Sequence, residues 1–172
     1  MKKLAIGVFL LAGLASADPV TDNFTQIIGI VEGDVVTLAE KMPADKYGYT
    51  PGASKVAGST FEGVRTFGEQ VRHLATVIYM VSQSALGDAK PPVDIGPKGT
   101  DGGPAKMTSK AELVTYLKGA VAYAKKAAAG INQKNMLDQV ADPFGSGKTT
   151  RLNAISIAGW HSFDHYGQMV VY

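Results

Sequence analysis

The chain has 172 residues, which is enough for one domain with a hydrophobic core. It contains no cysteine, and this excludes disulfides, thiolate metal ligands and a cysteine nucleophile. Its 17 basic and 15 acidic residues lack the strong basic excess that is typical of nucleic-acid-binding proteins. A metal or catalytic site must therefore use histidines, carboxylates or hydroxyls.

The first residues have the order of features of a secretory signal peptide. Two lysines open the chain, an apolar run follows over residues 4–14, and small residues occupy positions 15–17. The apolar run is shorter than the about 20 residues that a membrane-spanning helix needs. We predict that residues 1–17 are a signal peptide, that residues 18–172 form the mature domain, and that the protein is secreted or periplasmic. The alternative is a buried N-terminal helix, which explains this order less well.

Removal of the signal segment takes away two lysines and leaves 15 basic and 15 acidic residues. A formally neutral domain has no electrostatic reason to bind nucleic acid or an anionic membrane surface. We therefore expect no nucleic acid and no membrane as a partner of the mature protein. The expected partner is a small-molecule substrate or ligand.

Four stretches of the chain carry apolar residues at the three- and four-residue spacing of an amphipathic helix. They cover residues 19–42, 60–86, 109–129 and 149 to the chain end. No stretch alternates with a period of two for long, so we expect no sheet of consequence.

Capping and turn residues set the expected ends of these helices. Asp18-Pro19 is a typical helix start, and Pro43 stops the first helix. The capping-box pattern, serine followed three residues later by glutamate, begins at Ser59 and again at Ser109. These patterns predict the starts of the second and third helices.

Residues 87–107 form a long segment that is rich in glycine and proline, and no regular element is expected there. A loop of this length is uncommon in a compact domain unless it has a role. The simplest role is a crossover between two parallel helices, which is a known variant of helical bundles. We therefore predict an all-α four-helix bundle with a long crossover between helices 2 and 3.

The three histidines are the strongest candidates for a functional site. His161 and His165 are four residues apart, so a helix places both on one face. His73 lies near the middle of the second predicted helix and His161 near the middle of the fourth, so their depths in a bundle match. Neutral imidazole is the commonest metal ligand, and three such ligands leave a position open, as in catalytic zinc sites. The alternative is a chance pair on the surface and a core histidine with a satisfied hydrogen bond.

Other candidates for functional residues are weaker. Glu69 and Asp164 are the carboxylates nearest to the histidines in sequence and could orient them, but solvated surface charges explain them equally well. The stretch 145–150 ends like a phosphate-binding loop, although that pattern requires glycine where Asp142 stands. A flexible loop in which Thr149 or Thr150 caps the last helix explains this stretch better.

Three motifs follow one another in a distinctive order. They are Met42-Pro43-Ala44-Asp45-Lys46-Tyr47, then Phe67-Gly68-Glu69-Gln70-Val71-Arg72-His73-Leu74-Ala75, and finally His161-Ser162-Phe163-Asp164-His165-Tyr166-Gly167-Gln168. In this order, which spans essentially the whole mature chain, they resemble the DinB/YfiT-like superfamily of metalloenzymes. The resemblance implies an up-down-down-up four-helix bundle in which His73, His161 and His165 hold a divalent ion, commonly zinc or nickel. It also implies a homodimer.

The resemblance leaves the activity open. Some members of the superfamily are S-transferases or isomerases that use a low-molecular-weight thiol, and many have no known activity. The predicted export signal disfavours that role here, because a cytosolic thiol would be scarce outside the cell. We expect a metal-dependent hydrolase or group-transfer enzyme that acts on a small molecule. The alternatives are a bundle that binds a metal or a small ligand without catalysis, and a purely structural bundle whose histidines stay empty.

Overall fold

The structure is a computed structural model that describes residues 18–172 except 55–56, 59–61 and 146. The predicted signal segment lies outside the described residues. So do Ser59 and the two residues after it, on which the first predicted capping box depends.

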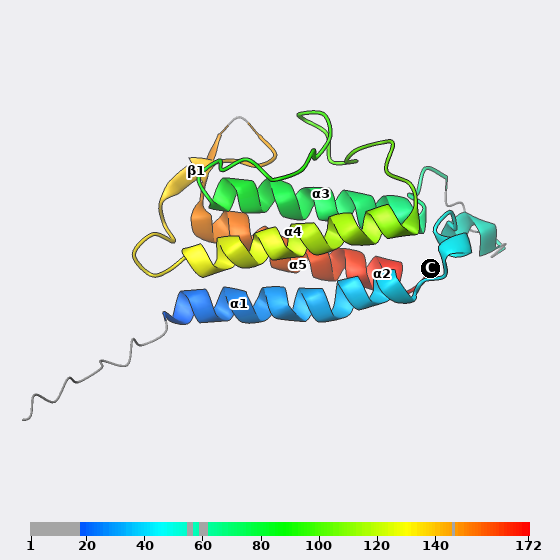
Figure 1. The fold of residues 1–172 in the computed structure, drawn as a ribbon, viewed down its shortest axis with the longest axis horizontal. Helices are drawn as coiled ribbons and strands as arrows, with labels where there is room; N and C mark the ends of the chain where they lie inside the picture. The colour runs from blue at the N-terminus through cyan, green and yellow to red at the C-terminus, as the bar shows by residue number, and fades with distance from the viewer. Residues whose placement is uncertain (1–17, 55–56, 59–61, 146) are drawn as a thin grey trace, which may run out of the picture.

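The described residues form a four-helix bundle with a small hairpin at one end (Figure 1). The first helical rod comprises α1, a π-helical turn and α2; the other three helices are α3, α4 and α5. Their bounds are Pro19–Val31 for α1, Glu32–Val36 for the π turn η1, Thr37–Lys41 for α2, Phe67–Ala85 for α3, Lys110–Gly130 for α4 and Arg151–Met169 for α5. Short 3₁₀ turns occupy Ala44–Lys46 and Pro51–Ser54.

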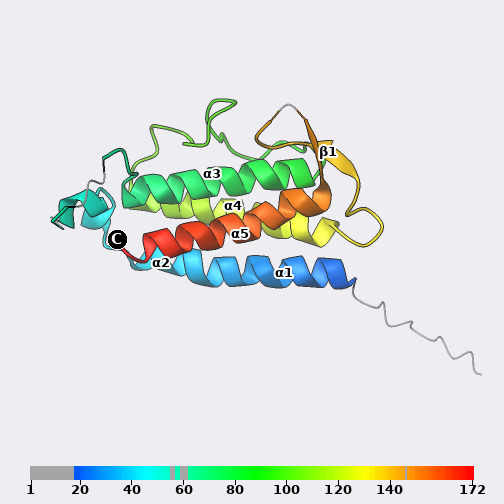
Figure 2. The ribbon, with the colours of Figure 1, turned by 180° about the vertical axis from the view of Figure 1, so that it is seen from behind.

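The helices run in the predicted directions. α3 and α4 run parallel, and the long loop between them returns along the bundle, whereas α1 and α5 run the opposite way (Figures 1 and 2). α3 packs on α4 and α5, and α1 packs on the same two helices from the other side. This confirms the all-α, up-down-down-up bundle with a long crossover between its second and third helices.

The first rod has the predicted span but not the predicted regularity. The Asp18 carboxylate caps it by accepting from the Val20 amide at 3.0 Å, and the rod ends before Pro43. The π turn η1 interrupts it and buries two adjacent residues, Val35 and Val36. The apolar spacing predicted one continuous α-helix here and did not predict this turn.

α3 begins at Phe67, so the prediction that this helix starts near residue 60 was wrong. Thr66 forms a capping box with Glu69: the Glu69 amide donates to the Thr66 hydroxyl at 3.2 Å, and the Thr66 amide donates to the Glu69 carboxylate at 2.8 Å. Just upstream, Gly63 has a φ of +74°, which an α-helix does not allow. Of two competing capping patterns, the second one therefore starts the helix.

The other helix ends agree with the predictions. Ser109 caps α4 in a capping box with Glu112, and the Thr150 hydroxyl accepts from the Asn153 amide at 3.1 Å to cap α5. Between these helices lies a hairpin that was not predicted, with β1 (Gln139–Ala141) antiparallel to β2 (Lys148–Thr150). Three-residue strands are too short to show an alternating pattern. None of the helices in the described part of the chain is long and apolar enough to span a membrane.

Tyr47 ties the end of the first rod to the start of α3. Its ring packs edge-on against Phe67 at 5.2 Å, and its buried hydroxyl donates to the Ala39 carbonyl at 2.6 Å. Burial, together with the charge of Glu40, raises the pKa of Tyr47 to about 12. The folded state therefore holds this proton more tightly than the unfolded chain, in which a tyrosine titrates near pH 10.

This pKa predicts a pH-dependent contribution to stability. Tyr47 contributes fully below pH 10, and its contribution is lost as the pH rises from 10 toward 12. We expect Tyr47→Phe to cost about 1 kcal/mol at pH 7, through the lost hydrogen bond, and to lose less stability than the wild type between pH 8 and pH 11. Thermal melts followed by circular dichroism check this expectation. Parallel decreases in Tm for both proteins would contradict it.

Candidate metal centre

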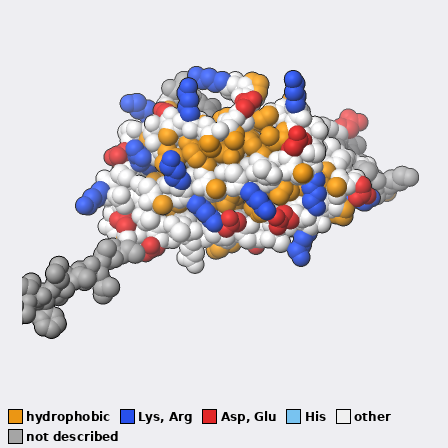
Figure 3. Space-filling view, in the orientation of Figure 1, with side chains coloured by type: hydrophobic (Ala, Val, Ile, Leu, Met, Phe, Trp, Pro, Cys, Tyr) orange, Lys and Arg blue, Asp and Glu red, His pale blue; other side chains and the backbone are white. Residues whose placement is uncertain are grey.

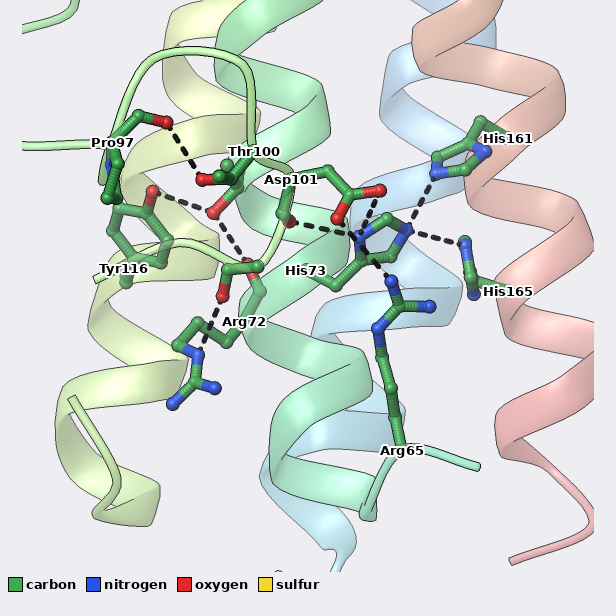
Figure 4. A network of polar contacts seen from close by, with 11 residues as sticks. Arg65, Arg72, His73, Pro97, Thr100, Asp101, Tyr116, His161 and His165 are labelled. Carbon is green, nitrogen blue, oxygen red and sulfur yellow. Dashed lines mark hydrogen bonds and ion pairs between the residues drawn. The ribbon is translucent and has the colours of Figure 1, made fainter. Parts of the chain in front are cut away.

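The three histidines lie together between α3 and α5 (Figure 4). His73 comes from the first half of α3, and His161 and His165 share one face of α5 as their spacing predicts. The Nε2 atom of His73 is 3.1 Å from Nε2 of His165 and 3.3 Å from Nε2 of His161. One nitrogen of each ring lies within 4.8 Å of the others. The structure thus brings together all three residues that the sequence singled out.

The imidazoles are kept neutral by their surroundings. His73 and His165 are only 4% and 5% exposed, and His161 is half-buried. Burial lowers the pKa of each ring because it disfavours the charged form, and Arg65 lowers it further. The neighbouring imidazoles add to this effect at His161 and His165. The pKa of His165 falls to about 4. Neutral imidazoles carry the lone pairs that a metal ion requires.

The protonation of the His73 ring is fixed from outside the cluster. Its Nδ1 atom lies 3.0 Å from the backbone carbonyl of Asp101, in the crossover. A carbonyl only accepts, so Nδ1 must carry the proton and Nε2 must present its lone pair to the other two histidines. Hydrogen bonds of this kind orient metal-bound histidines in proteins.

Hydrogen bonds alone leave ring nitrogens of the cluster without suitable partners. Nδ1 of His165 is buried without a partner among the described residues. If His165 donates from Nε2 to His73, that Nδ1 lone pair is left unpaired. If the proton is on Nδ1, the donor is unpaired and two Nε2 lone pairs face each other. A cation between the rings removes the repulsion of the facing Nε2 lone pairs, because it attracts both of them.

The spacing of the nitrogens suits a small divalent ion. Ligand nitrogens at about 2.0–2.1 Å from a tetrahedral zinc ion lie about 3.4 Å apart. The two Nε2 separations from His73, 3.1 and 3.3 Å, are close to that value. Imidazole donors suit zinc and nickel, so the residues present fit such an ion.

Arg72 and Gly103 hold the crossover in position over His73. The Arg72 side chain donates to the carbonyls of Gly102 at 2.8 Å and Met107 at 3.1 Å. Gly103 has a φ of +73° and lies directly against α3, where a Cβ would meet the Thr76 hydroxyl and the Arg72 side chain. This close approach places the Asp101 carbonyl on the His73 ring.

The carboxylates considered from the sequence have other roles. Glu69 belongs to the capping box of α3, and Asp164 accepts a hydrogen bond from Gln168 at 2.9 Å. Within the described part of the chain neither bonds to a histidine. Asp101 is the residue that sequence reasoning missed, and its signal was slight: an acidic residue between glycines in a loop too long to be a simple connection.

Comparison with known proteins identifies the family but no near relative. The family model of the DinB superfamily matches residues 30–169, which is most of the chain. No curated protein matches the chain, and no solved structure matches it either. The chain, a helical bundle with a buried cluster of three histidines between two of its helices, belongs to the DinB superfamily.

Proposed function

We propose that His73, His161 and His165 bind one divalent ion, zinc or nickel, and that the protein is a metal-dependent enzyme that hydrolyses a small molecule or transfers a group from it. The observation that carries this proposal is the convergence of three neutral imidazoles, in which Nε2 of His73 lies 3.1 Å from that of His165 and 3.3 Å from that of His161. An ion bound by three protein ligands supplies Lewis acidity at its open position.

The residues around the cluster provide the other requirements of such a site. Asp101 fixes the protonation of His73, and α5 holds the other two rings in register. His161 is less buried than its two partners, so a substrate would enter from its side. The Arg65 guanidinium points toward the cluster and lies 3.5 Å from the Asp101 carboxylate (Figure 4). This contact balances the charge of the carboxylate nearest to His73.

A metal-binding protein without turnover is the second candidate. The observation that favours it is the state of the carboxylates: Asp101 pairs with Arg65, Glu69 caps α3, and Asp164 is engaged by Gln168. In the described ranges, no carboxylate beside the cluster is therefore free to act as a general base.

We also propose that the protein is exported, on the basis of the features of residues 1–17.

Metal content tests the site directly. We expect the wild type, loaded with zinc or nickel and then dialysed, to retain about one ion per chain, as measured by mass spectrometry of the metal. His161→Ala removes one of three ligands, so its Kd should rise more than about 100-fold, beyond the effect of losing an orienting partner. Phe163→Ala, a change at a partly exposed neighbour on α5, is the control and should retain the ion. Equal metal content in wild type and His161→Ala would eliminate the site.

Turnover separates the two candidates. We expect hydrolysis or transfer with at least one class among esters, amides and thiol conjugates, to be lost on chelation and restored by zinc or nickel. His161→Ala should show less than about 1% of the wild-type rate, because the ion supplies the Lewis acid. Stoichiometric metal with no turnover on any class would support the binding protein instead.

The crossover predicts a further effect on metal affinity. Gly103→Ala should push the loop away from Thr76 and displace the Asp101 carbonyl, weakening metal binding about 10-fold. Gly99→Ala is the matched control: its φ of +80° is as unfavourable for alanine, but nothing lies within 4 Å of its Cβ position. Metal titrations of both variants check this. Equal affinities would show that the contact with Asp101 does not support the site.

A further inference from the structure

A recess lies beneath the crossover, on the side of α3 that packs on α4. It has a volume of about 960 Å³ and is walled by the crossover on one side and by α3 and α4 on the other. In the space-filling view, hydrophobic side chains gather in a hollow below the loop (Figure 3). None of the three histidines lines it, so this crossover recess is separate from the candidate metal centre.

We propose that the crossover recess binds an uncharged, largely apolar small molecule that carries one hydrogen-bond-accepting oxygen. Its size lies within the range of small-molecule sites in proteins. Three tyrosines form an aromatic wall: the ring of Tyr79 lies 5.3 Å from that of Tyr116 and 5.7 Å from that of Tyr123. Such a wall favours a flat, unsaturated ligand body.

The polar part of the proposed ligand follows from Tyr79. This residue is only 1% exposed, yet its hydroxyl has no hydrogen-bond partner in the described part of the chain. By contrast, the Tyr116 hydroxyl pairs with Thr76 at 3.0 Å, and the Tyr123 hydroxyl donates to the Ala89 carbonyl. A hydroxyl on the wall of the recess that has no partner within the described chain can donate to an oxygen of a bound molecule.

Gly119 makes room for the Tyr79 hydroxyl. A Cβ at this position of α4 would collide with that hydroxyl. The glycine sits in the middle of a helix, where it costs about 1 kcal/mol relative to alanine. The close approach of the hydroxyl to the bare backbone accounts for a glycine there, and both residues line the recess.

The charges at the rim argue for an uncharged ligand. The Glu112 carboxylate is engaged by Ser109, and Asp94 accepts from the Gly96 amide at 2.8 Å. Lys106 is exposed and so lies in solvent rather than inside the recess. An ionised group on a bound molecule would have no buried partner charge, and its desolvation would oppose binding.

The buried position of Tyr79 indicates that the occupant of the recess is a small molecule rather than the surface of another protein. A hydroxyl that belongs to a residue only 1% exposed can be reached by a molecule that enters the recess, but not by a flat partner face. A second copy of the chain is the competing occupant, and the experiment below distinguishes it.

Two probes of the same shape test the proposal. 2-Acetylnaphthalene carries a carbonyl, whereas 2-ethylnaphthalene replaces it with a methylene group. We expect both to bind the wild type. Tyr79→Phe should weaken binding of the ketone about 3- to 10-fold, the loss of one hydrogen bond, and leave the hydrocarbon unchanged. Fluorescence titration of the full mature chain measures both affinities.

Blocking variants locate the binding to the recess. Ala122 is exposed on α4 and lines the recess, so Ala122→Trp should abolish binding of both probes without disturbing the core. Ala129→Trp, at an exposed position of the same helix that does not line the recess, is the matched control and should bind both. Circular dichroism verifies the fold of each variant.

Three results would overturn the proposal. They are failure of both probes to bind the wild type, an unchanged preference for the ketone in Tyr79→Phe, and unchanged binding in Ala122→Trp. Sedimentation of the same proteins addresses the competing occupant. A dimer that Ala122→Trp dissociates, with no probe binding, would assign this face to a second copy of the chain.

Discussion

The hydrogen bond from Nδ1 of His73 to the Asp101 carbonyl is the constraint on which the candidate site depends. It fixes which nitrogen of His73 carries the proton and aims the lone pair of the other at His161 and His165. Without it, the ring could reverse its tautomer and donate into the cluster instead. The two histidines on α5 need no such device for their relative position, because four residues of helix place them on one face.

The topology of the bundle supplies this constraint. Because α3 and α4 run parallel, the chain must return along the whole length of the bundle before α4 begins (Figure 1). Arg72, the residue before His73, binds the returning loop through the carbonyls of Gly102 and Met107. One crossover thus serves two features: it orients the His73 ring on one side of α3 and roofs the apolar recess on the other.

The amino-acid sequence predicted the features that depend on regular spacing along the chain. The helical periodicity predicted the bundle, and the spacing of His161 and His165, with the depth of His73, predicted the cluster. Asp101 could not be predicted, because it acts through a backbone carbonyl that any residue possesses, placed by an irregular loop. The start of α3 was mispredicted because Ser59 and Thr66 both begin capping patterns. At the second of them, the Gly68 amide donates to the Tyr47 carbonyl, a contact between residues far apart in sequence. Tyr79 resembled an ordinary core residue, since only the structure shows that its hydroxyl has no partner among the described residues.

The central claim is that three imidazoles share one ion, and X-ray absorption spectroscopy at the metal edge tests it most directly. For the zinc- or nickel-loaded protein, the account predicts three imidazole nitrogens in the coordination shell, at about 2.0–2.1 Å in the case of zinc. A shell with fewer than three imidazoles, or one made up of carboxylate oxygens, would contradict it.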